Sequence, residues 1–208
     1  MYRCVATSVA GFVQQLAVSY IAHGYWFYVT GRIPEPKDPA AIDRKLIERY
    51  GLNVSKFTRA RHKRLGQARV QYLRHDRFFV LIATHGEHPF FTAEAGQIRD
   101  VRQAPVHFQG YTIGCRHGQG QWHPSVRIER EVHRELKARC VAIALQRSVE
   151  ELWREFQAIP FEPYAPVRDQ LHVILRAVNR RRHAAGLEPV PFAALRWRRR
   201  LVRPFAGD

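Results

Sequence analysis

A histidine-containing loop is the clearest candidate for chemistry in this chain. The hydrophobic run RFFVLIAT ends at residue 84 and is followed by His85, Gly86, Glu87 and His88. Loops at strand ends often carry catalytic residues, because the scaffold positions them and leaves them accessible. His85 and His88 could share a metal ion, and Glu87 could act as a general base toward a metal-bound water. His85, Glu87 and His88 are therefore the catalytic candidates, with His85 and His88 as candidate metal ligands.

The loop has no specific metal-binding signature. Its His-x-x-His spacing differs from that of the helical His-Glu-x-x-His site, and a third ligand would have to come from elsewhere, such as His107, His117 or His123. The chain has 11 histidines, so close pairs arise by chance. We expect hydrogen-bonded loop histidines here and no resident cofactor; a divalent metal is expected only if the protein is a nuclease.

Other nuclease patterns are equally incomplete. Glu135-Leu-Lys137 has the spelling of a Glu-x-Lys motif, but it lies in a predicted helix where residues i and i+2 face different directions. Tyrosine-type nucleases that cut single strands use a His-hydrophobic-His pair, which this chain lacks, although Tyr20, Tyr111 and Tyr164 could serve as nucleophiles. No phosphate-binding Gly-rich loop and no Gly-x-Ser-x-Gly elbow occurs. The sequence thus favours a protein that is not an enzyme, with a metal-dependent or tyrosine-type nuclease as the alternative.

The distribution of positive charge is the strongest signal. The formal net charge is +16, with a pI near 10.7. Residues 56–77, the first basic segment, carry a net charge of +7, and residues 176–203, the second basic segment, carry +8. A potential concentrated in this way attracts polyanions, whose counterions are released on binding.

The composition of these two segments suits nucleic acid. Arginine predominates, and its planar guanidinium fits phosphate bidentately and stacks on bases. Phe57, Tyr72, Trp197 and Phe205 could add aromatic faces for exposed bases. The predicted nucleic-acid contacts are Lys56, Arg59, Arg61, Lys63, Arg64, Arg69, Arg74, Arg180, Arg181, Arg182, Arg196, Trp197, Arg198, Arg199, Arg200 and Arg203. The alternative for Arg180–Arg182 is a solvated helix end, where cations oppose the helix dipole.

Periodicity and capping residues predict the elements that position these side chains. Three helices are expected over residues 8–22, 132–143 and 167–185. A further helix should begin at an Asp38 cap and end at Gly51, and a short one should follow the Ser148–Glu151 capping box. Strands are expected over 25–33, 68–75 and 77–85, followed by a hairpin of 105–117 with 124–129.

These elements predict an α+β fold with a small, mainly antiparallel sheet and flanking helices, followed by a helical C-terminal part with a basic tail. We expect an α+β domain over residues 1–130, containing a basic arm at about 55–77, and a helical part over 131–208 that packs on it. No stretch reaches the 18 apolar residues of a membrane span. The three cysteines form no Cys-x-x-Cys pair, which favours a reducing, cytoplasmic location.

The functional expectation is a basic RNA- or DNA-binding protein that grips phosphates through the two arginine-rich segments. Its partners would be nucleic acid and the other proteins of a nucleoprotein complex, a mobile element or a replication system. Membranes are not expected among them.

Overall fold

The computed structural model describes residues 2–206, except the side chains of Lys56, Arg59 and Lys63. The chain divides into two compact units, each considered by itself below. The first unit comprises the residues up to Val106, Ile113–Ser125, and the segment that begins at Val202. The second unit comprises His107–Thr112 and Val126–Leu201. The predicted domain boundary near residue 130 lies close to the division at 125/126, whereas the return of the C-terminal segment to the first unit was not foreseen.

The fold is α+β, as predicted, and a four-stranded antiparallel sheet lies at the centre of the first unit. Its strand order is β2-β3-β1-β4. The strands are β1 (Tyr25–Arg32), β2 (Val70–His75), β3 (Phe78–Thr84) and β4 (Arg99–Asp100). A two-residue turn joins β2 to β3, and Asp76 adopts a φ of 51° in it. The predicted hairpin therefore forms with the expected turn.

The central strands are buried on both faces. Tyr72 pairs with Leu81, and both belong to a hydrophobic core with Tyr50, Leu52 and Phe90. Neighbouring residues of opposite parity, such as Leu73, Val80 and Ile82, point to the other face and are also fully buried. Consecutive residues along β3 are apolar because side chains on both faces of the strand are buried.

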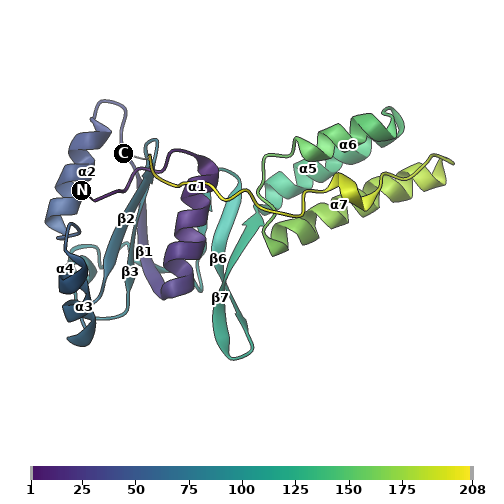
Figure 1. Cartoon of the computed structure of the whole chain (residues 1–208). Helices are drawn as coiled ribbons and strands as arrows, with labels where there is room; N and C mark the ends of the chain where they lie inside the picture. Colours follow the sequence, from purple (N-terminus) through teal and green to yellow (C-terminus); the bar gives the residue numbers. More distant parts are fainter. Residues whose placement is uncertain (1, 207–208) are drawn as a thin grey trace. The chain divides into compact units, whose positions relative to one another are not determined.

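Helices cover both faces of this sheet (Figure 1). On one side lies α1 (Val9–Gln14), which continues through a π-helical segment (Gln15–Tyr20) and a 3₁₀ turn (Ile21–His23) to Gly24. On the other side lie α2 (Pro39–Arg49), α3 (Lys56–Arg64) and α4 (Pro89–Ala93). Asp38 caps α2 by accepting hydrogen bonds from the Ala40 and Ala41 amides, as its sequence position predicted.

A three-stranded sheet contains β5 (Val106–Phe108), β6 (Tyr111–Gly118) and β7 (Gln121–Ile128), in that order. The turn between β6 and β7 is Gln119-Gly120, and both residues have positive φ, at 51° and 74°. Two consecutive positive φ values fit the right-handed twist of a tight hairpin. The predicted second hairpin is thereby confirmed, but its expected first strand, 105–117, is divided into β5 and β6 by a turn at Gln109-Gly110, where both φ values are positive. The division between the two units falls within this sheet.

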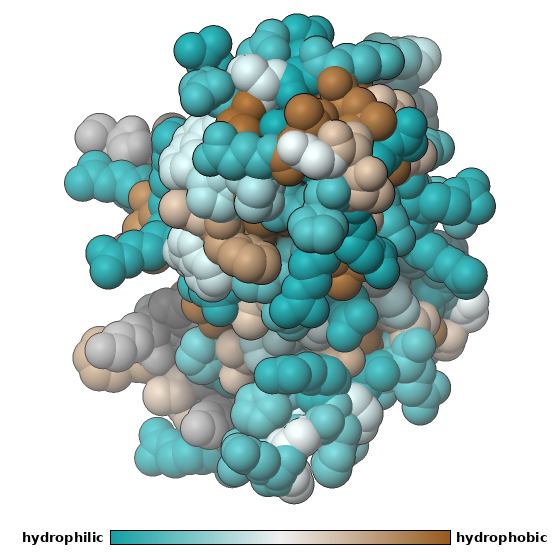
Figure 2. All heavy atoms as spheres, turned by 90° about the vertical axis from the view of Figure 1, so that its right-hand side faces the viewer, coloured by the Kyte–Doolittle hydropathy of each residue, from teal (hydrophilic) through white to brown (hydrophobic). Residues whose placement is uncertain are grey.

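The second unit consists mainly of α5 (Arg130–Ala142), α6 (Val149–Gln157) and α7 (Ala165–Ala184). Short 3₁₀ turns occur at Ile143–Leu145 and Phe192–Ala194. The capping box of α6 is present, with the Ser148 side chain accepting from the Glu151 amide and the Glu151 carboxylate from the Ser148 amide. The side of this unit shown in Figure 2 is mostly hydrophilic, with hydrophobic side chains exposed in patches.

The last residues of the chain lie against its beginning. The Thr7 amide donates to the Pro204 carbonyl at 2.9 Å, and the Gln14 side chain donates to the Val202 carbonyl at 3.0 Å. Ala6 and Phe205 form an isolated β-bridge. The end of the predicted basic tail is therefore part of the first unit. Over the residues that the structure describes, no helix is both long enough and apolar enough to span a bilayer.

Candidate nucleic-acid interface

The first basic segment begins with helix α3, for which the sequence predicted no regular element. Ser55 precedes the helix, and its hydroxyl accepts from the Thr58 amide. Arg61 and Arg64 are exposed, and the Phe57 side chain is 87% exposed. The side chains of the other predicted contacts here, Lys56, Arg59 and Lys63, lie outside the described residues. Helix α3 thus presents exposed guanidinium groups with an exposed aromatic ring.

The rest of the first basic segment is built into the sheet. The guanidinium of Arg69 lies over the Tyr25 ring, 5.3 Å from its centroid. Arg77 donates to main-chain carbonyls of the connection between β1 and α2, among them that of Pro34 at 2.8 Å. Tyr72, predicted as a possible stacking surface, is fully buried. These side chains serve the fold, because each lies in or next to strand β2 (Val70–His75) and is packed or hydrogen-bonded within the first unit.

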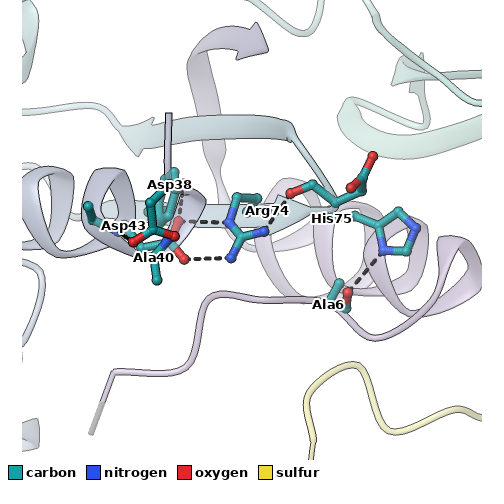
Figure 3. Close-up of polar contacts among 9 residues, drawn as sticks. Ala6, Asp38, Ala40, Asp43, Arg74 and His75 are labelled. Carbon is teal, nitrogen blue, oxygen red and sulfur yellow. Dashed lines mark hydrogen bonds and ion pairs between the residues drawn. The ribbon is translucent and has the colours of Figure 1, made fainter. Parts of the chain in front are cut away.

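Arg74 is the clearest case of a predicted contact with a structural partner (Figure 3). Its Nε donates to Oδ1 of Asp43 at 2.7 Å, and its Nη2 donates to Oδ2 at 2.7 Å. The Tyr72 hydroxyl donates to the same carboxylate at 2.6 Å. Hydrogen bonds from the guanidinium to Asp43 raise the pKa of Arg74, while burial and the bond to Asp43 raise the pKa of Tyr72. In this structure the guanidinium of Arg74 faces a carboxylate inside the fold and is not available to a phosphate.

The three consecutive arginines at the end of α7 occupy two different environments. Arg180 and Arg181 are exposed, whereas Arg182 is only 4% exposed. Nε of Arg182 donates to the Glu188 carbonyl at 2.6 Å, and Nη1 donates to the carbonyls of Ala144 at 2.8 Å and Arg147 at 2.9 Å. Arg182 therefore joins α7 to two neighbouring loops.

The arginines that follow α7 also divide into two groups. Arg196 is half-buried, and its Nη2 donates to the Ile159 and Phe161 carbonyls at 2.7 and 2.8 Å. Arg199 lies over the Tyr164 ring, 4.5 Å from its centroid. The exposed residues are Arg198, Arg200 and, within the segment assigned to the first unit, Arg203. Trp197 is 48% exposed, so an aromatic ring lies among exposed arginines in the second unit.

The loop of His85–His88 is a capping structure. Nδ1 of His88 accepts from the Phe90 amide at 3.1 Å, which caps α4, and the ring also forms a hydrogen bond with the Tyr50 main chain. Burial and the nearby His62 lower the pKa of His88. With both sides of its imidazole engaged, His88 has no free nitrogen for a metal ion.

The other predicted ligands do not converge on His88. His85 is exposed and its ring lies 6.3 Å from that of Phe27, while Glu87 is exposed and accepts from the Ala68 amide through its carbonyl. Within residues 2–206 no group of three or more His, Cys, Asp or Glu side chains is arranged to hold a metal ion. Gly86, at φ 133°, could not carry a Cβ atom, which would lie 2.4 Å from the Gly66 carbonyl oxygen. In this loop His88 is hydrogen-bonded, and the ring of His85 lies beside that of Phe27.

The candidate tyrosine nucleophiles are weaker acids in the fold than a free tyrosine side chain. Burial raises the pKa of Tyr20 to about 12 and that of Tyr111 to about 12, and it also raises the pKa of Tyr164. The Tyr111 hydroxyl accepts from the Glu162 amide at 2.8 Å. None of these three environments favours a phenolate.

Two concave surfaces were not foreseen from sequence. One is a cleft of about 510 Å³ in the first unit, whose walls include Arg49, His62, Arg69, Glu87 and His88. The other is a groove along α7, with Val173 and Phe192 among its lining residues. The spacing of Val173, Arg176 and Arg180 places them on one helical face, but the sequence does not reveal that the chain after α7 folds back beside them.

Comparisons with protein-family models, with curated protein sequences and with solved structures give no match to this chain. Function must therefore be argued from the surfaces themselves.

Proposed function

We propose that this chain binds RNA or DNA by gripping phosphate groups with the exposed arginines of two surfaces. The α3 surface consists of Phe57, Arg61 and Arg64. The α7–tail surface consists of Arg176, Arg180, Arg181, Trp197, Arg198 and Arg200. The two surfaces lie in different units, and nothing in the proposal depends on how those units are arranged.

One observation carries this proposal. Among the described residues, none of the arginines of the two surfaces forms an ion pair with a carboxylate through its guanidinium group. Two other exposed arginines of the second unit do pair, Arg134 with Glu131 and Arg147 with Glu151. Guanidinium groups without acidic partners keep their full positive potential and are suited to release counterions from a polyanion.

The internal bonds of Arg74, Arg182 and Arg196 sharpen the predicted contact set. Each of these three guanidinium groups is held by a carboxylate or by main-chain carbonyls. We assign them to holding the fold and assign phosphate contacts to the exposed arginines around them. A phosphate-based grip gives modest sequence preference, which suits a component of a nucleoprotein complex, a mobile element or a replication system. We infer a cytoplasmic location from the three free cysteines, two of them buried.

The salt dependence of binding tests the proposal. If the five arginines of the α7–tail surface contact phosphates, affinity for a single strand should fall by about two orders of magnitude between 50 and 200 mM salt. Fluorescence anisotropy of a labelled 20-nucleotide RNA or DNA strand would measure this slope. A flat salt response would overturn the proposal.

Matched double variants locate the contacts. Arg180→Ala with Arg181→Ala, and separately Arg198→Ala with Arg200→Ala, should each lower the slope of log K against log salt by about 1.4 for a single strand. The control is Arg134→Ala with Arg139→Ala, which removes the same charge from exposed positions on α5. An equal decrease in slope for all three double variants would mean that only the net charge of the protein matters for binding. That result would remove the α7–tail surface from the proposal.

A further inference from the structure

Exposed apolar side chains gather beside the arginines of α7. Phe192 is 48% exposed, Trp197 is 48% exposed and Val173 is 46% exposed, all within the second unit. Apolar side chains left in solvent on a well-packed unit often mark a binding surface. Between the two aromatic residues of this segment, Ala194 and Leu195 are buried, at 0% and 3% exposed. The backbone that carries the two aromatic rings is therefore anchored while the rings remain in solvent.

Side-chain hydrogen bonds fix this backbone against α7 and α6. Asn179 on α7 both donates to the Val190 carbonyl at 2.8 Å and accepts from the Val190 amide at 2.9 Å. Gln157 on α6 donates to the Ala194 carbonyl at 2.8 Å. Arg168 on α7 donates to the Trp197 carbonyl at 3.1 Å. An aromatic contact made from this segment would lose little conformational entropy on binding, because its main chain is already ordered.

His172 links the two exposed rings. Its imidazole lies 5.5 Å from the Phe192 ring and 5.1 Å from the Trp197 ring, with interplanar angles of 69° in both cases. Its Nε2 is buried and has no hydrogen-bond partner among the described residues. Phe192, His172 and Trp197 thus form one continuous aromatic cluster.

Beside this cluster runs a groove of about 650 Å³ along α7. Its lining includes Val173, Arg176, Asn179, Arg180, Pro189 and Phe192. Arg176 and Arg180 are exposed and lie about one helical turn apart, about 6 Å along the axis. The groove thus combines an apolar, aromatic side with two guanidinium groups.

We propose that this groove, together with Trp197, binds unpaired bases of a single-stranded nucleic acid. The inference rests on the proposed function and deepens it by naming the form of nucleic acid. Bases offer flat apolar faces for Phe192 and Trp197, while the adjoining phosphates fit Arg176 and Arg180. A duplex keeps its bases stacked in pairs, so it can use the arginines but not the aromatic rings.

The test compares two kinds of ligand, single strands and a duplex, on the same protein. Fluorescence anisotropy at one salt concentration would measure affinity for labelled 12-nucleotide strands, poly(U) and poly(A), and for a 12-base-pair duplex. Phe192→Ala and Trp197→Ala should each weaken single-strand binding by about 5- to 100-fold and change duplex binding by less than about twofold. The matched control is Leu187→Ala, which truncates a 39% exposed apolar residue of the same unit outside the groove lining and should leave both affinities unchanged.

Three further variants keep the aromatic packing of the groove. Val173→Glu adds a carboxylate to an exposed position in the groove and should weaken single-strand binding by about tenfold, whereas Val173→Lys should not weaken it. Trp197→Phe keeps a stacking ring and should retain affinity. It should also abolish the component of tryptophan quenching that the single strand produces in the wild type.

Failure of this inference can be told from failure of the proposed function. If neither ligand binds with a steep salt dependence, the proposed function itself fails. If both bind steeply but the Phe192 and Trp197 variants behave like Leu187→Ala, only the groove inference is overturned. That second outcome would also be expected if the groove instead received an apolar peptide.

Discussion

The run Arg180-Arg181-Arg182 gives the sharpest test of how the structure assigns roles to identical residues. We expect Arg182→Ala to destabilise the second unit strongly and Arg181→Ala to leave its stability nearly unchanged. Arg182 is buried and donates three hydrogen bonds of 2.6–2.9 Å to main-chain carbonyls. Its removal leaves those three carbonyls without their donor in a poorly solvated site.

The magnitude follows from the bonds. A hydrogen bond to a charged group contributes about 1.5–3 kcal/mol, so three lost bonds, partly replaced by entering water, should cost about 4 kcal/mol of unfolding free energy. With a urea m-value of about 2 kcal/mol/M, the midpoint should fall by about 2 M. Arg181 is exposed, and its change to Ala should shift the midpoint by less than about 0.3 M.

The assay is urea unfolding followed by tryptophan fluorescence in a Trp26→Phe, Trp122→Phe background, where Trp153 and Trp197 report on the second unit alone. Arg182→Lys keeps the charge but not the planar fork, so it should lose about half as much stability. The effects on nucleic-acid binding should be the reverse of those on stability. Arg181→Ala should lower the slope of log K against log salt, whereas Arg182→Ala that remains folded should leave this slope unchanged. A midpoint shift below 0.5 M for Arg182→Ala would refute this reasoning.

Three further predictions concern the first unit. Asp43→Ala leaves the Arg74 guanidinium buried without its carboxylate and should cost about 3–5 kcal/mol, while Asp43→Leu combined with Arg74→Met should recover most of that loss in urea unfolding. Deleting residues 202–208 removes the bonds of the C-terminal segment to Thr7 and Gln14 and should lower the melting temperature of this unit by about 10 °C; an unchanged melting curve would contradict the docking of that segment. The pKa of His88 is lowered in the fold, so the unfolded chain binds a proton at this residue more readily than the folded chain. The contribution of His88 to the free energy of unfolding is therefore fully present above the unfolded pKa of about 6.5 and is lost as pH falls below it. The stability advantage of wild type over His88→Asn, which keeps a capping oxygen, should therefore shrink between pH 7.5 and 5.5, and a constant difference would count against this.

Local signals in the sequence were sufficient to predict most of the elements. The Asp38 cap and the Ser148–Glu151 capping box each depend on groups within four residues of one another, and so does the Gln119-Gly120 turn that joins the predicted hairpin strands. Their geometry is a short-range property of the backbone, so it can be predicted from residue type and spacing. The α+β class and the two basic segments followed in the same way. Helix α3 was missed because nine residues with five cations and no hydrophobic stripe give no amphipathic pattern.

The role of each basic residue was decided only by tertiary structure. Arg74 and Arg182 have the same side chain as Arg64 and Arg181, but partners 31 and 38 residues away bury the first two. The return of the chain beside α7, which places Phe192 near Val173, likewise depends on Asn179 and Val190 meeting across 11 residues. Charge along a sequence is additive and can be counted, whereas burial and hydrogen-bond partners depend on which distant segments pack together. The sequence alone therefore determined how much positive charge the protein carries and in which segments, and the fold decided which of those charges remain free to meet a phosphate.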